Sequence, residues 1–172
     1  MPILRLAQSN PLTDGRQSER TLAIRRGIVC LLEGYGSAVL AEFPLANGRR
    51  ADLLALDRKG QFTIIEIKSS IEDFRSDSKW PDYRAYCDQF AFATAPDVPP
   101  EIFPEEEGLF IADQFGAEML RAPIETKLAG ARRKALTLRF ARMAAIRLER
   151  TTQFGLEQGL DLVANNSADT ID

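Results

Sequence analysis

The sequence predicts an α/β domain in which a three-strand antiparallel meander is flanked by helices. Three observations predict it: apolar runs of strand length, tight-turn signals between them, and helical segments on either side. At 172 residues the chain is long enough for one domain with a substantial core. We expect this domain to cover residues 1–163 and residues 164–172 to form a polar tail.

The first expected elements are a helix and a strand. Residues 1–17 show little periodicity, whereas Ser18 is a suitable N-cap for an apolar, periodic helix that extends through Glu33. Residues 38–45 read as the first strand. Asn47-Gly48 then predicts a hairpin turn into a second strand.

A second hairpin is expected over residues 50–70. The apolar runs 53–56 and 62–67 flank the short polar loop 58–60. A three-residue hairpin loop commonly ends in a left-handed residue, which Gly60 supplies without steric strain. The first three strands therefore form a meander.

That loop predicts the register of the hairpin. If Asp57 faces Gln61, then Asp52 opposes Glu66, and alternation places Lys68 on the same face of the sheet. The hairpin would then end in two carboxylates and one ammonium group.

Two explanations of this cluster stay open. Opposed carboxylates in apolar surroundings repel each other unless they share a proton, meet a cation or bind a metal ion. A hard divalent ion is one natural partner, because such ions prefer oxygen ligands. The other explanation is an ion cluster at a solvated strand end, with Lys68 as the countercharge.

The middle of the chain alternates between helical and strand patterns. Residues 69–87 are polar and aromatic and read as a helical segment that is interrupted near Pro81. Residues 89–95, 108–113 and 117–121 read as three further strands.

The C-terminal part is basic. We expect a long helix over residues 128–150 and a short one over 156–163. Residues 127–150 carry eight basic side chains and one acid, a net charge of +7, and the basic side chains do not share one helical face. This helix either balances an acidic remainder or contacts phosphates, for which Arg132 and Arg133 are the candidates.

Composition limits the chemistry. The chain has a net charge of −3 and no histidine, which excludes Ser-His-Asp triads, Cys-His dyads and histidine-ligated zinc. Acid–base work would fall to carboxylates, lysine, tyrosine or metal-bound water. Cys30 and Cys87 match no metal-ligand spacing. With neither a signal peptide nor a membrane-spanning apolar run, we expect a cytoplasmic protein with free thiols and no membrane partner.

The predicted element order, with D-x13-E-x-K across the second and third strands, resembles the PD-(D/E)xK nuclease superfamily. The motif falls on Asp52, Glu66 and Lys68, although Ala51 stands where the motif's proline would be. The resemblance implies a restriction-endonuclease-like core with a mixed sheet.

A narrower resemblance covers most of the chain. The blocks DFRSDSKWPDYRAYCDQFAFA, EEGLFIADQFGAEMLRAP and LAGARRKALTLRFARMAAIRL resemble the bacterial MmcB-like DNA-repair family, placed within that superfamily. This resemblance implies DNA as the partner, in damaged, branched or single-stranded form, with other repair proteins as further partners. It also implies a nucleoid-associated location. Relatives of this fold often dimerise, so a homodimer is also expected.

The same resemblance implies metal-dependent hydrolysis of phosphodiester bonds. Asp52, Glu66 and the backbone carbonyl of Ile67 would hold Mg²⁺ or Mn²⁺. Glu19 matches the extra acidic ligand of many members and would bind directly or through water; Glu33 is its rival at the far end of the helix. The lysine of the motif would orient the attacking water or stabilise the charge that develops on the phosphorane.

The segment after the motif carries the candidates for substrate contact, which are Arg75, Lys79, Trp80 and Tyr83. Stacking of Trp80 or Tyr83 on an unpaired base would favour single-stranded or flapped DNA. Alternatively, Trp80 caps the core while its neighbours are solvated. Asp73 and Asp77 would oppose phosphate unless they face away or pair with neighbouring basic side chains.

Three functional interpretations remain. A metal-dependent nuclease is favoured by the presence of all four motif residues, Glu19, Asp52, Glu66 and Lys68. A non-catalytic module that binds DNA or a repair partner is favoured by the acidic net charge. The third is an α/β protein with a structural ion cluster.

Overall fold

The computed structural model describes residues 18–168, and the side chains of residues 18–157. The chain divides into two compact units: residues 17–136 carry the sheet, and residues 137–168 belong to the other unit as the continuation of a long helix. The motif residues all lie in the first unit.

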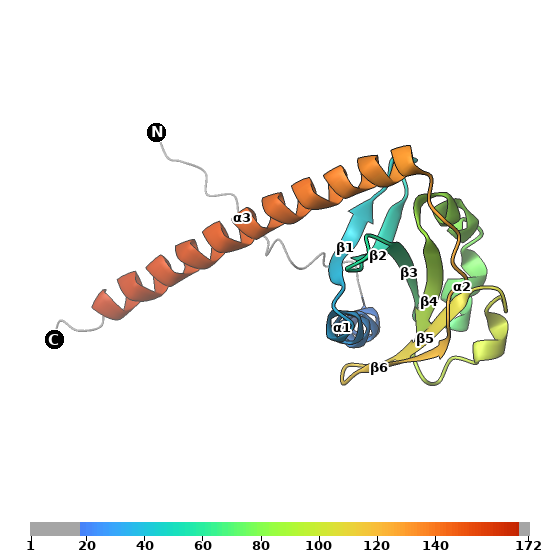
Figure 1. Ribbon diagram of the computed structural model, residues 1–172. Helices are drawn as coiled ribbons and strands as arrows, with labels where there is room; N and C mark the ends of the chain where they lie inside the picture. The colour runs from blue at the N-terminus through green and yellow to red at the C-terminus, as the bar shows by residue number, and fades with distance from the viewer. Residues whose placement is uncertain (1–17, 169–172) are drawn as a thin grey trace. The chain divides into compact units, whose positions relative to one another are not determined.

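One six-stranded mixed sheet forms the centre of the first unit, with its strands in sequence order. The first three strands pair antiparallel, β4 and β5 are parallel to β3, and β6 returns antiparallel to β5 (Figure 1). The predicted fold class, a mixed sheet with a three-strand antiparallel meander flanked by helices, is therefore confirmed. The strands are β1 (Ala38–Pro44), β2 (Arg50–Leu56), β3 (Phe62–Lys68), β4 (Gln89–Thr94), β5 (Gly108–Ala112) and β6 (Ala117–Arg121).

Helix α1 (Glu19–Gly34) covers one face of this sheet. The Ser18 side chain caps it by accepting a hydrogen bond from a first-turn backbone amide, as its sequence position predicts. Gly27 marks a close approach, because a Cβ there would lie 2.3 Å from the carbonyl oxygens of Asp113 and Gly116. The apolar side of the helix packs against odd-numbered strand residues: Ile24, Ile28 and Leu32 meet Leu53, Ala55, Ile65, Ile67, Ala91 and Ala93.

The hairpin of β2 and β3 has the predicted register. Leu54 pairs with Ile64, and the loop closes through an amide of Asp57 that donates to the carbonyl of Gln61 at 3.1 Å. Gly60 adopts the left-handed conformation, with φ of +80°. Because side chains alternate along a strand, this register places the motif acids on the face opposite α1.

That opposite face is covered by an aromatic cluster and by two short elements, α2 (Ile71–Ser76) and the 3₁₀ helix η1 (Trp80–Tyr86). The segment was expected to be a helix interrupted near Pro81, but the break lies earlier. Pro81 instead occupies the first turn of η1, where its missing amide costs no hydrogen bond. The rings in contact are Phe74, Trp80, Tyr83, Phe90, Phe92 and Phe103.

Helix α3 (Gly130–Ala168) is continuous, so the expected division into helices over 128–150 and 156–163 is wrong. The helix extends past residue 164, and residues 169–172 of the expected tail lie outside the described part of the chain. No proline follows Pro123, and a glycine inside a helix costs only about 1 kcal/mol, so nothing forces a break. A second 3₁₀ turn, η2 (Pro100–Ile102), lies in the proline-rich loop. Among the described residues, no helix has the apolar length needed to cross a membrane.

Candidate active site

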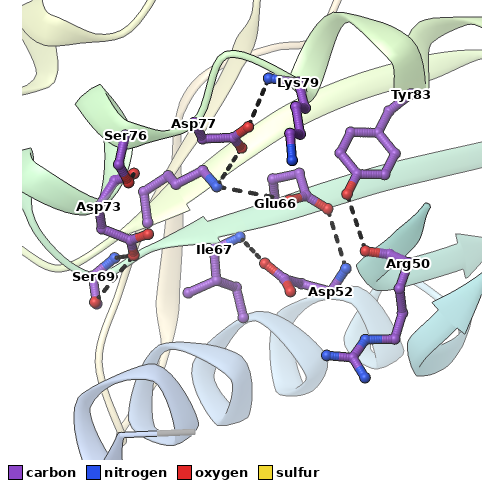
Figure 2. Close-up of polar contacts among 11 residues, drawn as sticks. Arg50, Asp52, Glu66, Ile67, Ser69, Asp73, Ser76, Asp77, Lys79 and Tyr83 are labelled. Atoms are coloured by element: carbon purple, nitrogen blue, oxygen red, sulfur yellow. Dashed lines mark hydrogen bonds and ion pairs between the residues drawn. The ribbon is translucent and has the colours of Figure 1, made fainter. Parts of the chain in front are cut away.

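Strands β2 and β3 separate at the end of their hairpin, and two carboxylates fill the gap. The backbone ladder stops at Leu53 and Ile65. Beyond it, the Asp52 amide donates to Oε1 of Glu66 at 3.2 Å, and the Ile67 amide donates to Oδ2 of Asp52 at 2.8 Å (Figure 2). Each carboxylate therefore accepts a hydrogen bond from a backbone amide of the other strand. In a regular ladder, a backbone carbonyl would accept that hydrogen bond.

Beyond the point where its pairing with β2 ends, β3 stays paired with β4. The parallel pairing of β3 and β4 runs on to Lys68 and Thr94, and the Thr94 hydroxyl donates to the Lys68 carbonyl at 2.6 Å. The two acids thus meet as the register predicted, but through side-chain bonds rather than as a regular cross-strand pair.

Lys68 lies between two carboxylates at this strand end. Its Nζ atom is 3.8 Å from Oε2 of Glu66 and 2.7 Å from Oδ2 of Asp77, the C-cap residue of α2. Lys68 is 6% exposed and Glu66 is 4% exposed. The lysine is therefore a buried cation with an unexpected stronger partner, Asp77, in addition to the predicted motif acid.

Burial sets the protonation of the site. It raises the pKa of Asp52 to about 6, against the stabilising Ile67 amide, and the charges of nearby acids add to the increase. Burial, reinforced by the charge of Asp52, raises the pKa of Glu66 well above its usual range. Burial alone would lower the pKa of Lys68, but the Asp77 hydrogen bond raises it. A further positive charge near these two carboxyl groups would therefore stabilise their ionised forms.

The donor set fits a hard divalent cation in part. One oxygen of each motif carboxylate accepts an amide, which leaves Oδ1 of Asp52 and Oε2 of Glu66 as ligands. The Ile67 carbonyl lies on the same side of β3 as its amide, toward β2, because an extended residue directs both groups to one neighbour. Mg²⁺ commonly takes a few protein oxygens and keeps several waters, so three donors suffice. No three acidic side chains within the described residues converge as a ligand cluster.

Sequence and structure comparisons place the chain among known proteins. The model of the family described as DNA repair protein MmcB-like matches residues 8–154, which is most of the chain. The chain belongs to the MmcB-like family of DNA repair proteins. The resemblance seen in the sequence is therefore confirmed at the level of the family.

Two solved structures are similar to this MmcB-like protein. A protein of unknown function from Silicibacter pomeroyi is 41% identical, with a TM-score of 0.74 over 77% of this chain and 91% of that one. A repair endonuclease from Pyrococcus abyssi is 18% identical, with a TM-score of 0.38 over 59% of this chain and 48% of that one, a likeness too low to support any conclusion. A search of curated proteins finds no match.

Glu19 stands apart from the acid pair. It is exposed at the start of α1, next to Arg20, whose guanidinium pairs with Asp97 just beyond the end of β4. That end of α1 thus lies at the same edge of the sheet as Lys68, but on the face away from the acid pair. Glu19 is therefore near the predicted metal site without joining it.

A third acid near the pair is Glu42, which the sequence analysis missed. The register of β1 and β2 places Glu42 opposite Asp52, and its charge helps to raise the pKa of Asp52. Its backbone is left-handed, with φ of 49°, a strained conformation for a residue with a side chain. Nε of Arg50 lies 2.6 Å from its carboxylate. Extending the register through the Asn47-Gly48 turn would have identified it.

The aromatic candidates for DNA stacking lie in the core of this family member. Trp80 stacks on Phe90 with 5.6 Å between ring centroids. Tyr83 is 7% exposed, and its hydroxyl donates to the Arg50 carbonyl at 3.0 Å. The structure therefore agrees with the interpretation that Trp80, which is half-buried, caps the core, and it buries the Tyr83 ring.

Of the basic candidates, Arg75 and Lys79 are exposed, and Figure 2 shows the Lys79 side chain extending toward Glu66.

Arg133 is not at the site: its guanidinium bonds both oxygens of Asp88, at 2.9 and 2.5 Å. The neighbouring Arg132 donates to the carbonyl of Ala85 and lies over the ring of Tyr86. Both arginines thus link the start of α3 to the rest of the first unit.

The arginine pair lies at the end of the sheet away from the acids. Arg133 also donates to the carbonyl of Gly60 in the hairpin loop, and β3 runs from Phe62 to Lys68, about 20 Å at 3.3 Å per residue. Glu33 belongs to this far end too, since a Cβ on nearby Gly36 would touch an arginine of the hairpin loop. Glu33, the rival of Glu19 for the extra ligand position, therefore lies far from the acid pair.

Proposed function

We propose that this chain hydrolyses DNA phosphodiester bonds, using Mg²⁺ or Mn²⁺ held by Asp52, Glu66 and the Ile67 carbonyl. The observation that carries this proposal is the acid pair, in which Glu66 is buried, Asp52 is half-buried, and each carboxylate is fixed by an amide of the opposite strand. Nζ of Lys68 lies 3.8 Å from the Glu66 carboxylate. Membership of a DNA repair family supports DNA as the substrate class. Damaged, branched and single-stranded DNA are the forms to test, with repair proteins and a second copy of the chain as further partners.

When bound, the metal ion would polarise the scissile phosphate and lower the pKa of a coordinated water. The chain supplies a preorganised setting. The amides of Asp52 and Ile67 hold the two carboxylates in place before any ligand arrives. Lys68 stays protonated because its pKa is raised, so it acts as a hydrogen-bond donor to phosphate oxygens or to the attacking water, and not as a base.

Cleavage of labelled DNA tests the proposal. The purified protein is incubated with single-stranded, duplex, nicked, flapped and branched DNA, with Mg²⁺, Mn²⁺ or EDTA. Metal-dependent cleavage that falls by about 10²- to 10⁴-fold, to a low but measurable rate, in Asp52→Asn and Lys68→Ala is expected. Glu33→Gln, an exposed acid at the far end of α1, is the matched control and should cleave like wild type. Cleavage that persists undiminished in both site variants would assign the activity to a contaminant.

Metal binding is tested separately from cleavage. Titration of Mn²⁺ by calorimetry should give binding heat with wild type, and little or none with Asp52→Asn. The asparagine keeps an oxygen that can accept the Ile67 amide, so the strand separation should persist while one negative charge is lost. Equal heats from the two proteins would remove the metal site.

A second function, a non-catalytic DNA-binding module, is favoured by the near-complete burial of Glu66 and Lys68. Under this alternative, wild type and Glu66→Gln bind DNA equally and neither cleaves it. Fluorescence anisotropy over a salt series measures the binding, and a steep decrease of affinity with salt would indicate phosphate contacts. Equal binding without cleavage on every DNA form would replace the nuclease proposal with this one.

A further inference from the structure

Asp77 is the closest charged partner of the motif lysine. Its Oδ2 atom is 2.7 Å from Nζ of Lys68, whereas the motif acid Glu66 is 3.8 Å from the same nitrogen. We infer that Asp77 is the positioning residue of Lys68. It holds the ammonium group away from the acid pair, in a position from which the ammonium can contact a phosphate or a water. This inference rests on the proposed function, and it assigns a role to a residue outside the D…ExK motif.

The carboxylate of Asp77 is itself fixed in place. Its second oxygen, Oδ1, accepts the backbone amide of Lys79 at 2.8 Å. Its own amide donates to the Phe74 carbonyl at 3.2 Å, which closes the end of α2. Both oxygens and the backbone of Asp77 are therefore committed, so the position of Lys68 Nζ follows from the position of this loop.

Two aromatic side chains anchor the loop on the strand next to the site. Phe74 and Trp80, three residues before and three after Asp77, both contact Phe92, with centroids 5.5 and 5.4 Å away. Phe92 is in turn the β4 partner of Glu66 in the parallel register. The aromatic cluster therefore presents Asp77 to Lys68 from β4, the strand next to the one that carries Glu66 and Lys68. Trp80 thereby helps to fix the position of this loop.

A positioning group is needed here for a physical reason. A lysine side chain has about 2 kcal/mol of rotamer entropy to lose, and the acid pair attracts its ammonium group strongly in buried surroundings. Without Asp77, Lys68 would turn toward Glu66 and occupy the space in which the metal ion is proposed. The side chain of Asp77 is 18% exposed and that of Lys68 only 7%, so this ion pair is largely shielded from solvent.

Kinetics of DNA cleavage by Asp77→Asn tests the inference. The asparagine keeps an acceptor for the Lys79 amide, so the loop should stay folded while the negative charge that holds Lys68 is lost. We expect kcat to fall by about 10- to 100-fold, as for a misplaced catalytic group, with KM for DNA within twofold of wild type. Asp77→Glu should recover part of the loss. Asp82→Asn, on the following 3₁₀ helix and paired with Arg49, is the matched control.

A double variant separates positioning from general stability. If Asp77 acts through Lys68, then Asp77→Asn adds no further loss of kcat to Lys68→Ala. Independent, multiplying losses would overturn the inference, and so would wild-type kcat in Asp77→Asn.

A readout without DNA distinguishes failure of this inference from failure of the nuclease proposal. The protein is treated with an amine-acylating ester, and modification of each lysine is followed by peptide mass spectrometry. Lys68 should react at least fivefold more slowly in Asp77→Asn than in wild type, because its ammonium group turns inward to the buried Glu66, with exposed Lys59 unchanged and Asp82→Asn like wild type. An unchanged or faster Lys68 rate overturns the inference. A slower rate in a protein that cleaves no DNA supports the positioning contact and rejects the nuclease.

Discussion

The two ends of strand β3 both carry buried carboxylates, and they differ in how those carboxylates are satisfied. At the hairpin-loop end, Asp88 is 2% exposed and accepts amides of Phe62 and Leu128 together with the Arg133 guanidinium. At the other end, Asp52 and Glu66 each accept a single amide and share one lysine that has a closer partner.

The pKa shifts at the two ends are opposite. Burial of Asp88 is outweighed by the Arg133 bond and two amides, so its pKa is lowered. For Asp52 and Glu66 burial prevails, so the pKa of each carboxyl is raised. Burial alone therefore does not indicate a functional acid. The difference lies in the hydrogen bonds and cations that the fold supplies, and a deficit of these at a strand end indicates a place for a ligand.

The largest expected effect concerns catalysis. Glu66→Gln should lower metal-dependent DNA cleavage by about 10²- to 10⁴-fold, the range for loss of a principal catalytic group. Asp88→Asn should leave the rate per folded molecule within a fewfold of wild type, because Asp88 lies at the other end of β3. Single-turnover assays on protein of verified folded fraction measure both. An equal loss of cleavage rate in the two variants would show that the two ends of β3 do not differ in their role in catalysis.

The largest expected effect on stability belongs to Asp88. Asp88→Ala removes a carboxylate that joins β3, the start of α3 and Arg133, and it leaves two amides and a guanidinium without that acceptor. The loss should be about 3 kcal/mol in the free energy of unfolding. Urea denaturation followed by circular dichroism measures it. A loss below about 1 kcal/mol would show that Asp88 is not the structural acid described here.

The opposite sign is expected at the acid pair. In the absence of metal, Glu66→Gln should raise the free energy of unfolding by about 1 kcal/mol, since it removes a carboxylate that burial and Asp52 disfavour. Addition of Mn²⁺ should stabilise wild type more than the variant and remove this advantage. Thermal melts with and without Mn²⁺ measure both. A destabilised Glu66→Gln protein would assign Glu66 to structure.

The smallest expected effect is a pH dependence with opposite slopes. The pKa of Asp88 is lowered by folding, so its stabilisation is present above about pH 4 and is lost as the pH falls below that value. The pKa of Asp52 is raised to about 6, so the folded state binds protons more tightly and stability decreases as the pH rises from about 4 to 6.

Unfolding at several pH values without metal, on wild type, Asp52→Asn and Asp88→Asn, separates the two slopes. Asp52→Asn should lose part of the decrease between pH 4 and 6, by about 1 kcal/mol. Asp88→Asn should lose part of the decrease below pH 4. Identical pH profiles in all three proteins would contradict both assignments.

Much of the fold was predictable because local signals agreed with the global topology. Gly60 and the alternation of apolar residues set the hairpin register, and the Ser18 cap placed the start of α1. The roles of the side chains after β3 were less accessible. Trp80 and Tyr83 have the composition of a base-stacking surface, but their rings face Phe90 on a strand that is near in space and later in sequence.

The sequence by itself determined the α/β class, the meander and the meeting of Asp52 with Glu66, because strand alternation and turn geometry act over short distances. Only the tertiary structure decided which charges are satisfied. Asp77 reaches Lys68 because the aromatic loop packs on β4, and Arg133 is bound by Asp88, 45 residues earlier. Such pairings depend on contacts between distant segments, so no local pattern contains them.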